Sequence, residues 1–198
     1  MLAVHRAPRL GRCHRLVPQG RSQANMDRLL EFRVRLHSWR VRRAIASCGR
    51  GIRTIPPTSL SDAQNITIGD NFSSMGGALL YANDGELEVG DNCALNTNVQ
   101  LGAAHGTIRL GHNVIIGPNV VLRAADHGIT PGSPPRAQPH QRGSISIGDD
   151  VWIGANAVIT RNVELGAGCV IGAGAVVAHD IPPNAIAVGT PAKVIGFR

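Results

Sequence analysis

His127 is the residue of this 198-residue chain best suited to chemistry. It lies in the stretch LRAADHGITPGSPPRAQPHQRGSISIG, residues 122–148, where a regular pattern of aliphatic and small residues gives way to proline, glycine and arginine. A neutral imidazole, with an ordinary pKa near about 6.5, can accept the proton of a hydroxyl as that hydroxyl attacks as a nucleophile. A loop histidine by itself is more often a surface residue. The position of His127, directly before the only large interruption of the pattern, favours a general base.

The regular pattern on either side is a six-residue repeat, in which an aliphatic residue precedes small and polar ones. It is clearest in the units IGPNVV, IGANAV, LGAGCV and IGAGAV. A short fixed period is typical of a solenoid, in which each unit buries its face only by stacking on the next. Three units form one coil, and the predicted coil starts are Ile68, Val89, Leu110, Ile147 and Leu165. We therefore expect an all-β solenoid of about five triangular coils; the periodicity alone does not set its hand.

The interruptions of the repeat all follow the third unit of a coil, so we expect them to leave the solenoid at one corner. The largest is an extended loop at 128–144, which its prolines make semi-rigid. Its arginines Arg136 and Arg142 could meet phosphate or an acidic sugar, and we expect its His140 on the surface rather than in a site. The solenoid is expected over 61–182, followed by a C-terminal extension at 183–198, because the paired prolines of DIPPN stop further coiling.

Stacking of the coils predicts the neighbours of His127. Counting from each coil's third unit gives Asp84, His105 and Asp126 the same position in successive coils, so that they form one column, and His127 falls in the next column. Neighbouring coils are separated by about 4.8 Å, the spacing of paired strands. Asp126 and His105 are therefore expected beside the imidazole, where a carboxylate can fix its tautomer. Asp126 then either bonds His127, pairs with His105 or merely ends the corner.

The basic charge of the chain is concentrated at its start. The net charge is +7, yet the thirteen arginines of residues 1–60 face only Asp27 and Glu31, and acidic residues outnumber basic ones afterwards. We expect residues 1–25 to be disordered, with Met26 as an alternative start. Residues 26–60 are expected to hold a basic amphipathic helix at 27–49 and a linker. The favoured role of this helix is to cover one end of the solenoid; the alternative is contact with an anionic membrane as a peripheral protein.

Composition limits the remaining classes of protein. Aromatic residues make up 3% of the chain and glycines number 24, which favours a core of stacked aliphatic side chains. The four cysteines are far apart, so a reducing, cytoplasmic compartment fits better than a disulfide scaffold. No apolar run approaches the roughly 20 residues of a membrane span. Because the basic charge lies outside the solenoid, we expect no nucleic-acid partner.

Three blocks of the sequence carry a more specific resemblance. They are IGPNVVLRAADHG, ISIGDDVWIGANAVI and DIPPNAIAVGTPAKVI, in this order. Residues 66–195 thereby resemble the hexapeptide-repeat acyltransferases, and most of all the maltose, galactoside and polysaccharide O-acetyltransferases. The resemblance implies a left-handed parallel β-helix, a homotrimer, and acetyl-CoA bound in the cleft between neighbouring prisms, with no metal. The implied function is transfer of an acetyl group to a hydroxyl of a sugar or polysaccharide precursor.

The resemblance also implies roles for individual residues. His127 takes the place of the catalytic base, and the backbone N–H of Ala155 that of the oxyanion donor. Asn96 would contact the acceptor sugar, although a structural ladder with Asn98 is nearly as plausible. Trp152 would line the cleft beside the histidine, and Asp126 would belong with the substrate-binding residues.

Two further positions match the cofactor end of the family's site. Ala173 falls where backbone groups receive the pantetheine arm, and Lys193 where a basic residue meets the phosphates of CoA. Ala178 and His179 stand where members of the family often carry Thr-Lys, so the nucleotide contacts are expected to differ.

Several alternatives remain open from the sequence. The same prism serves amino-sugar N-acetyltransferases and serine acetyltransferases. It also serves γ-type carbonic anhydrases, whose zinc site needs two ligands about five residues apart on one turn. His105, His112 and His127 do not form such a pair, which disfavours a metal site. A non-catalytic scaffold is the last alternative.

Overall fold

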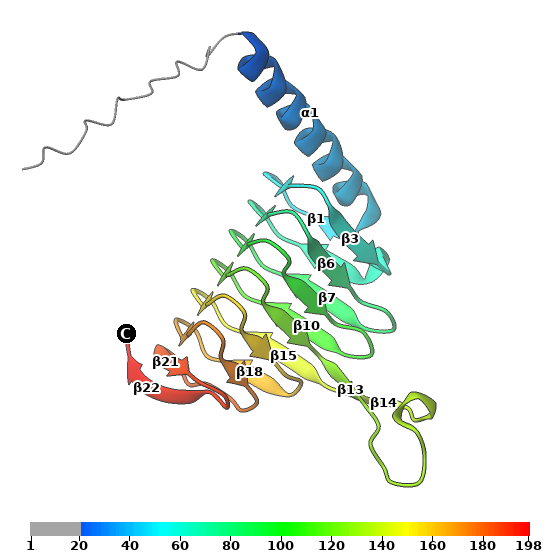
Figure 1. Cartoon of the computed structure of the whole chain (residues 1–198), viewed down its shortest axis with the longest axis vertical. Helices are drawn as coiled ribbons and strands as arrows, with labels where there is room; N and C mark the ends of the chain where they lie inside the picture. The colour runs from blue at the N-terminus through cyan, green and yellow to red at the C-terminus, as the bar shows by residue number, and fades with distance from the viewer. Residues whose placement is uncertain (1–20) are drawn as a thin grey trace, which may run out of the picture.

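The computed structural model describes residues 21–198. It shows one helix at the end of a three-sided parallel β-helix, with a hairpin projecting from one corner (Figure 1). Residues 1–20, most of the segment we expected to be disordered, lie outside the described range. Helix α1 spans Arg21–Ala44, so it begins and ends earlier than the expected 27–49. Nothing in the sequence breaks a helix before Asp27, and after Ala44 the chain is recruited into a strand. None of the helices in the described range combines the length and apolar character that crossing a membrane demands.

Three parallel sheets form the faces of the prism, and each coil adds one strand to each sheet. The first sheet contains β1 (Ser47–Cys48), β4 (Ile66–Ile68), β7 (Glu86–Val89), β10 (Thr107–Leu110), β15 (Ser144–Ile147) and β18 (Val163–Leu165). The second contains β2 (Arg53–Thr54), β5 (Ser73–Ser74), β8 (Ala94–Leu95), β11 (Ile115–Ile116), β16 (Trp152–Ile153) and β19 (Val170–Ile171). The third contains β3 (Thr58–Ser61), β6 (Ala78–Tyr81), β9 (Gln100–Gly102), β12 (Val121–Arg123), β17 (Val158–Ile159) and β20 (Val176–Val177).

Four strands lie outside this regular pattern. β13 (Ala125–His127) and β14 (His140–Arg142) form the projecting hairpin. β21 (Ala185–Val188) continues the second sheet in parallel, and β22 (Lys193–Phe197) closes it in antiparallel. Short 3-10 helices occupy Ala63–Asn65 and Pro135–Ala137. The C-terminal extension therefore covers the end of the second sheet opposite the helix.

The predicted register of the repeat is confirmed by the strand pairing. Ile68, Val89, Leu110, Ile147 and Leu165 follow one another in the first sheet as paired neighbours. All five are buried, and they belong to one continuous aliphatic core.

The structure has six complete coils rather than about five. The additional coil, β1 to β3, occupies the region where we expected a linker. Its inward positions include Cys48 and Thr54 instead of large aliphatic residues, which hides the repeat in the sequence. Thr54 is buried, but its polar groups are paired: its hydroxyl donates to Ser38 Oγ of α1 at 3.3 Å and its backbone N–H donates to the same oxygen at 2.9 Å. The helix therefore completes the first coil.

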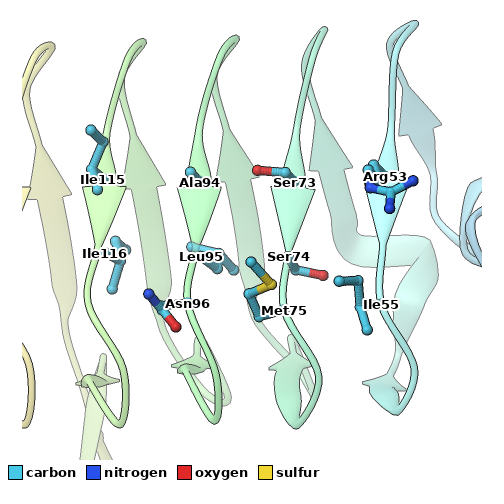
Figure 2. A pocket seen from close by; sticks show the side chains of 10 residues that line it. All are labelled: Arg53, Ile55, Ser73, Ser74, Met75, Ala94, Leu95, Asn96, Ile115 and Ile116. Atoms are coloured by element: carbon cyan, nitrogen blue, oxygen red, sulfur yellow. The ribbon is translucent and has the colours of Figure 1, made fainter. Parts of the chain in front are cut away.

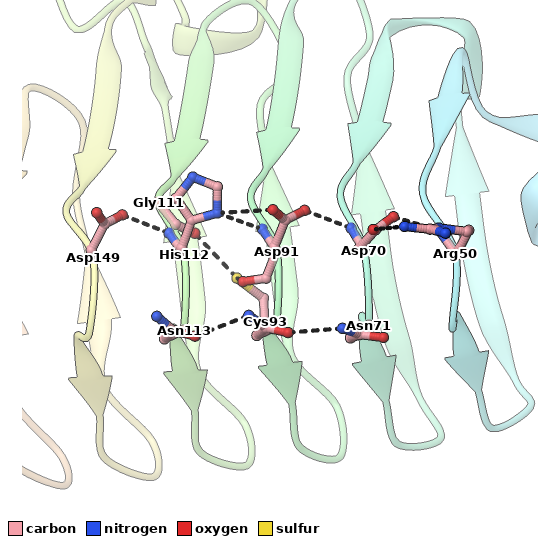
Figure 3. A network of polar contacts seen from close by, with 10 residues as sticks. Arg50, Asp70, Asn71, Asp91, Cys93, Gly111, His112, Asn113 and Asp149 are labelled. Atoms are coloured by element: carbon pink, nitrogen blue, oxygen red, sulfur yellow. Dashed lines mark hydrogen bonds and ion pairs between the residues drawn. The ribbon is translucent and has the colours of Figure 1, made fainter.

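Polar ladders hold the corner between the first and second sheets in register (Figure 3). The backbone N–H of Asp70 donates to Asp91 Oδ1 at 2.6 Å, and that of Asp91 donates to His112 Nδ1 at 3.0 Å. Next to them the side chains of Asn71, Asn92 and Asn113 hydrogen-bond in series. These asparagines have φ values of 57° to 58°, a left-handed conformation that asparagine tolerates well. His112, a candidate ligand in the metal alternative, is thus part of a structural ladder.

We expect the inward column of the third sheet to dominate stability. Leu80→Ala should lower the free energy of unfolding by about 2–5 kcal/mol, because Leu80 is fully buried and its removal leaves a cavity. Leu79 on the same strand points outward and is half-buried, so Leu79→Ala is the matched control and should cost clearly less. Chemical denaturation of both variants at equal protein concentration tests this; equal losses would contradict it.

Candidate active site

The hairpin that carries His127 leaves the corner that follows the third sheet. β13 and β14 pair in antiparallel, with His127 opposite His140 and Ala125 opposite Arg142. Gln138 closes the loop between them. Its Oε1 accepts from Thr130 N–H at 2.8 Å, and its Nε2 donates to Ser133 O at 2.6 Å. The prolines and this one amide give the hairpin a defined shape, which fixes where His140 lies.

Three histidines meet at the base of the hairpin. The ring of His140 stacks on His105 with centroids 4.1 Å apart and lies 4.5 Å from the centroid of His127. On the far side His105 Nδ1 lies 3.3 Å from Asp84 Oδ2, and Arg142 binds the same carboxylate. Desolvation, followed by the charges of His105 and His127, lowers the pKa of His140. His140 is exposed on the surface, as expected, and it also lines the pocket that holds His127.

Asp126 adopts an arrangement that the column count did not predict. Its carboxylate accepts a hydrogen bond from Arg161 Nε at 2.6 Å, and Arg161 also donates to Gln141 of the hairpin at 2.6 Å. The count assumed that residue 126 continues the coil, whereas it already belongs to β13. Asp126 and Arg161 thus anchor the hairpin to the next coil.

His127 lines an open pocket together with His105, His140, Arg123 and Tyr81. The Arg123 guanidinium lies 5.3 Å above the Tyr81 ring. Gly102 leaves room for that ring, since a Cβ at this position would lie 2.2 Å from the Tyr81 hydroxyl. The His127 side chain itself is exposed at the edge of this pocket, where a substrate hydroxyl can reach it.

A second group of predicted residues lies on the second sheet, in a groove of its own. Asn96, Trp152, Ala155 and Ala173 all line this groove. Its floor is apolar, and Trp152 stands beside its strand partner Ile115 with more than half of each side chain exposed. The predicted residues of this sheet are therefore brought together by the structure.

Ala155 lines the groove, and its backbone N–H has no hydrogen-bonding partner in residues 21–198. Ile116 pairs with Ile153, so Pro118, two residues after Ile116, occupies the same turn position in the preceding coil as Ala155. Proline has no backbone N–H. The fold therefore does not need this N–H, which leaves it available to a ligand.

Asn96 lies at the end of the groove and also borders a smaller apolar pocket toward the helix (Figure 2). Its Oδ1 accepts from the N–H of Thr97 at 2.8 Å. The structural ladder that we considered for Asn96 runs instead through Asn98, Asn119 and Asn156. Asn96 is thus exposed and outside the ladder.

The His127 pocket and the Trp152 groove have no lining residue in common. Within one chain Trp152 consequently does not stand beside His127, and Lys193, exposed on β22, lines neither. In the part of the chain that the structure covers, no three His, Cys, Asp or Glu side chains are grouped so that they could hold a metal ion. His140 stacks on His105, and its ring is tilted by 40° against that of His127.

Comparison with known proteins confirms the hexapeptide repeat. Residues 144–179 match the family model described as bacterial transferase hexapeptide (six repeats). A putative acetyltransferase of Schizosaccharomyces pombe is 59% identical over 51 residues, which is 26% of this chain and 25% of that protein. A 2,3,4,5-tetrahydropyridine-2,6-dicarboxylate N-acetyltransferase of Staphylococcus aureus is 52% identical over 62 residues, 31% of this chain and 24% of that protein. The chain matches only about a quarter of the length of these curated relatives.

Solved structures resemble the chain over most of its length. The N-acyltransferase AntD from Bacillus cereus, in complex with dTDP and 3-hydroxybutyryl-CoA, has a TM-score of 0.70 at 20% identity and covers 89% of this chain and 88% of its own. A maltose O-acetyltransferase from Clostridium difficile 630 has a TM-score of 0.59 at 26% identity, covering 90% and 89%. The expected left-handed parallel β-helix is thereby confirmed, with one coil more than predicted.

The histidine cluster predicts a titration that can be measured. We expect His140 to titrate below the ordinary range of a histidine, and its pKa to rise in His105→Gln, because that change removes a stacked, chargeable neighbour. If the hairpin detached and His140 lost its contacts with His105 and His127, His140 would bind a proton more readily than it does in the stacked arrangement. The stacked arrangement should therefore become less stable as the pH falls through about 6.5 and recover above it.

NMR titration of the His140 ring follows both effects. His179→Gln, a change in an exposed histidine near the C-terminus, is the control and should leave His140 unchanged. A normal pKa for His140 in the unsubstituted protein would show that the three rings do not stack in solution.

Proposed function

We propose that this hexapeptide-repeat protein is a CoA-dependent acyltransferase, with His127 as the general base. The observation that carries the proposal is the placement of two complementary groups. An accessible imidazole stands at the edge of a polar pocket, and an unpaired backbone N–H belongs to Ala155, which lines an apolar groove. These are the groups that transfer from a thioester to a hydroxyl needs.

The chemistry assigns one step to each group. His127 takes the proton of the acceptor hydroxyl while its oxygen bonds to the acyl carbon of acetyl-CoA. The Ala155 N–H donates to the oxyanion that forms on the thioester carbonyl. The carbon–sulfur bond then breaks, and the CoA sulfur receives the proton from the imidazolium. The groove over Ile115, Trp152 and Ala173 would hold the pantetheine arm, and exposed Lys193 would meet the phosphates.

Direct transfer is favoured over a covalent acyl-enzyme. Among residues 21–198, Cys93 and Cys169 are buried and Cys48 is partly buried, whereas Cys13 lies outside the described range. Burial raises the pKa of all three, that of Cys169 to about 11, so these thiols stay protonated near neutral pH. They are free thiols, which agrees with a reducing, cytoplasmic compartment.

A complete site is proposed to form between copies of the chain in a homotrimer. His127 belongs to a pocket at one corner, whereas Trp152, Ala155 and Ala173 lie on the second sheet. If the second sheet of one prism faces the hairpin corner of the next, the base of one copy meets the groove of its neighbour.

The proposed acceptor is a hydroxyl of a sugar or polysaccharide precursor. The maltose O-acetyltransferase relative supports this choice. AntD, an N-acyltransferase with a similar fold, also has a solved structure with dTDP-4-amino-4,6-dideoxyglucose, which is the reason to test an amino sugar as the second candidate. Asn96 and Asp126 would contribute to acceptor binding. Release of free CoA, measured across neutral sugars, nucleotide sugars, amino sugars and serine, separates these acceptors.

His127→Ala should lower turnover by about a hundredfold or more while the fold and assembly persist, because a positioned base contributes about 10²–10⁴-fold. Turnover is measured by release of free CoA, and assembly by light scattering. Near-normal turnover would show that another group takes the proton.

Ala155→Pro removes a single N–H and should lower turnover by about a hundredfold, the effect of losing one oxyanion donor. Pro118 shows that the turn accepts proline at this position. Ala155→Gly retains the N–H and is the matched control, expected near the original rate. Equal rates for the proline and glycine variants would place the oxyanion elsewhere.

Mixing the two inactive variants tests the shared site. Co-expressed His127→Ala and Ala155→Pro chains should recover part of the activity, because some interfaces would pair an intact histidine with an intact groove. No recovery, with mixed assembly shown by mass spectrometry, would place the whole site within one chain.

A further inference from the structure

Helix α1 has an inner face that is fully accounted for by the fold. Val34, Ser38 and Val41 are buried at spacings of four and three residues, and Ile45 is buried directly after the helix ends. These residues pack toward β2 and the first coil. This is the cover that we predicted for the end of the solenoid. It uses only one side of a 24-residue helix.

The outer face of α1 is apolar without a structural reason. Leu29, Phe32, Leu36 and Trp39 recur at spacings of three and four residues, which places them on one stripe opposite the buried face. Phe32 is 62% exposed and Trp39 is 51% exposed. A continuous exposed stripe of large apolar side chains marks an interaction site more often than a chance arrangement.

Rows of arginine border this stripe on both sides. Arg28, Arg35 and Arg42 recur every seven residues along one edge, and Arg33 and Arg40 along the other. The two acidic residues of the helix, Asp27 and Glu31, lie on its inner half, where Glu31 forms a two-point ion pair with Arg53 of β2 at 2.8 and 3.0 Å. The outer face is therefore apolar at its centre with arginines along both edges, and near its N-terminal end Asp27 and Glu31 share a surface pocket with Phe32 and Arg35.

A basic pocket adjoins the stripe. Arg35, Arg42 and Arg53 line it together with Trp39 and Ile52. Arg43 lies 4.7 Å from the Trp39 ring, which holds that ring beside the pocket. Guanidinium groups around a pocket of this kind suit the phosphate of a lipid headgroup.

We propose that the outer face of α1 binds a membrane surface that contains anionic lipid. Leu29, Phe32, Leu36 and Trp39 enter the boundary between headgroups and acyl chains, and the arginine rows contact lipid phosphates. A second copy of the chain is a poor occupant, because two such faces would bring their arginines together. The binding surface is separate from the His127 pocket, so this proposal does not depend on acyl transfer.

The test is co-sedimentation of the full chain with vesicles. We expect binding to an equal mixture of phosphatidylglycerol and phosphatidylcholine, little binding to phosphatidylcholine alone, and weakening by salt. Arg35→Gln with Arg42→Gln should weaken binding by roughly thirtyfold, since each arginine near an anionic surface contributes about fivefold. Arg136→Gln, in the exposed loop, is the matched control and should bind normally.

The apolar contribution is tested separately. Phe32→Ser with Trp39→Ser should abolish binding, whereas Ile129→Ser, a change at an exposed apolar residue of the hairpin, should not. In Trp152→Phe the remaining tryptophan is Trp39, and its fluorescence should shift to the blue when anionic vesicles are added. Equal binding to neutral vesicles, or full binding by either α1 variant, would overturn the proposal. The proposal would also be overturned if the Phe32→Ser, Trp39→Ser double variant formed a smaller oligomer than the unsubstituted protein in the absence of vesicles. That result would show that this face is a contact between copies of the chain.

Discussion

The hydrogen-bonded register between coils is the constraint on which the whole molecule depends. Each coil donates and accepts along the full length of its strands, so each must repeat the path of its neighbour about 4.8 Å away. Inward aliphatic side chains stack in columns that a shift of one residue would turn outward. Extra residues can therefore leave only at a corner, where pairing is already interrupted. The hairpin that carries His127 and His140 uses such a corner.

The same constraint separates the functional groups. A prism only three strands around has no interior space for a substrate, because aliphatic side chains fill it. Any site must lie on a flat face or at a corner. His127 lies at a corner and Ala155 on the second sheet, and the two pockets share no lining residue. The rigidity that makes each half of the site precise also prevents one chain from folding the halves together, which is why a shared site between copies is the natural arrangement.

Features fixed by the repeat could be predicted from the sequence, and features fixed by single side chains could not. The column from Ile68 to Leu165 and the corner of the long insertion follow from periodicity alone. The first coil was missed because its inward Thr54 is stabilised by Ser38, a partner on a separate helix. The contact of the exposed His140 with His127 was not predicted, because it depends on the hairpin register that Gln138 closes. Asp126 was assigned to a column that the chain has already left, and Arg161 is its partner.

Helix α1 has one face that the fold requires to be apolar and an opposite face that it does not. The end of a parallel β-helix exposes unpaired strand edges, so the fold requires a cover with an apolar inner face. Val34 and Val41 satisfy that requirement. The fold makes no demand on the opposite face, where charged or small side chains would keep the protein soluble at no loss of stability. Phe32 and Trp39 on that face are therefore unexplained by folding, and their bordering arginines give them an environment that only a surface both apolar and anionic complements.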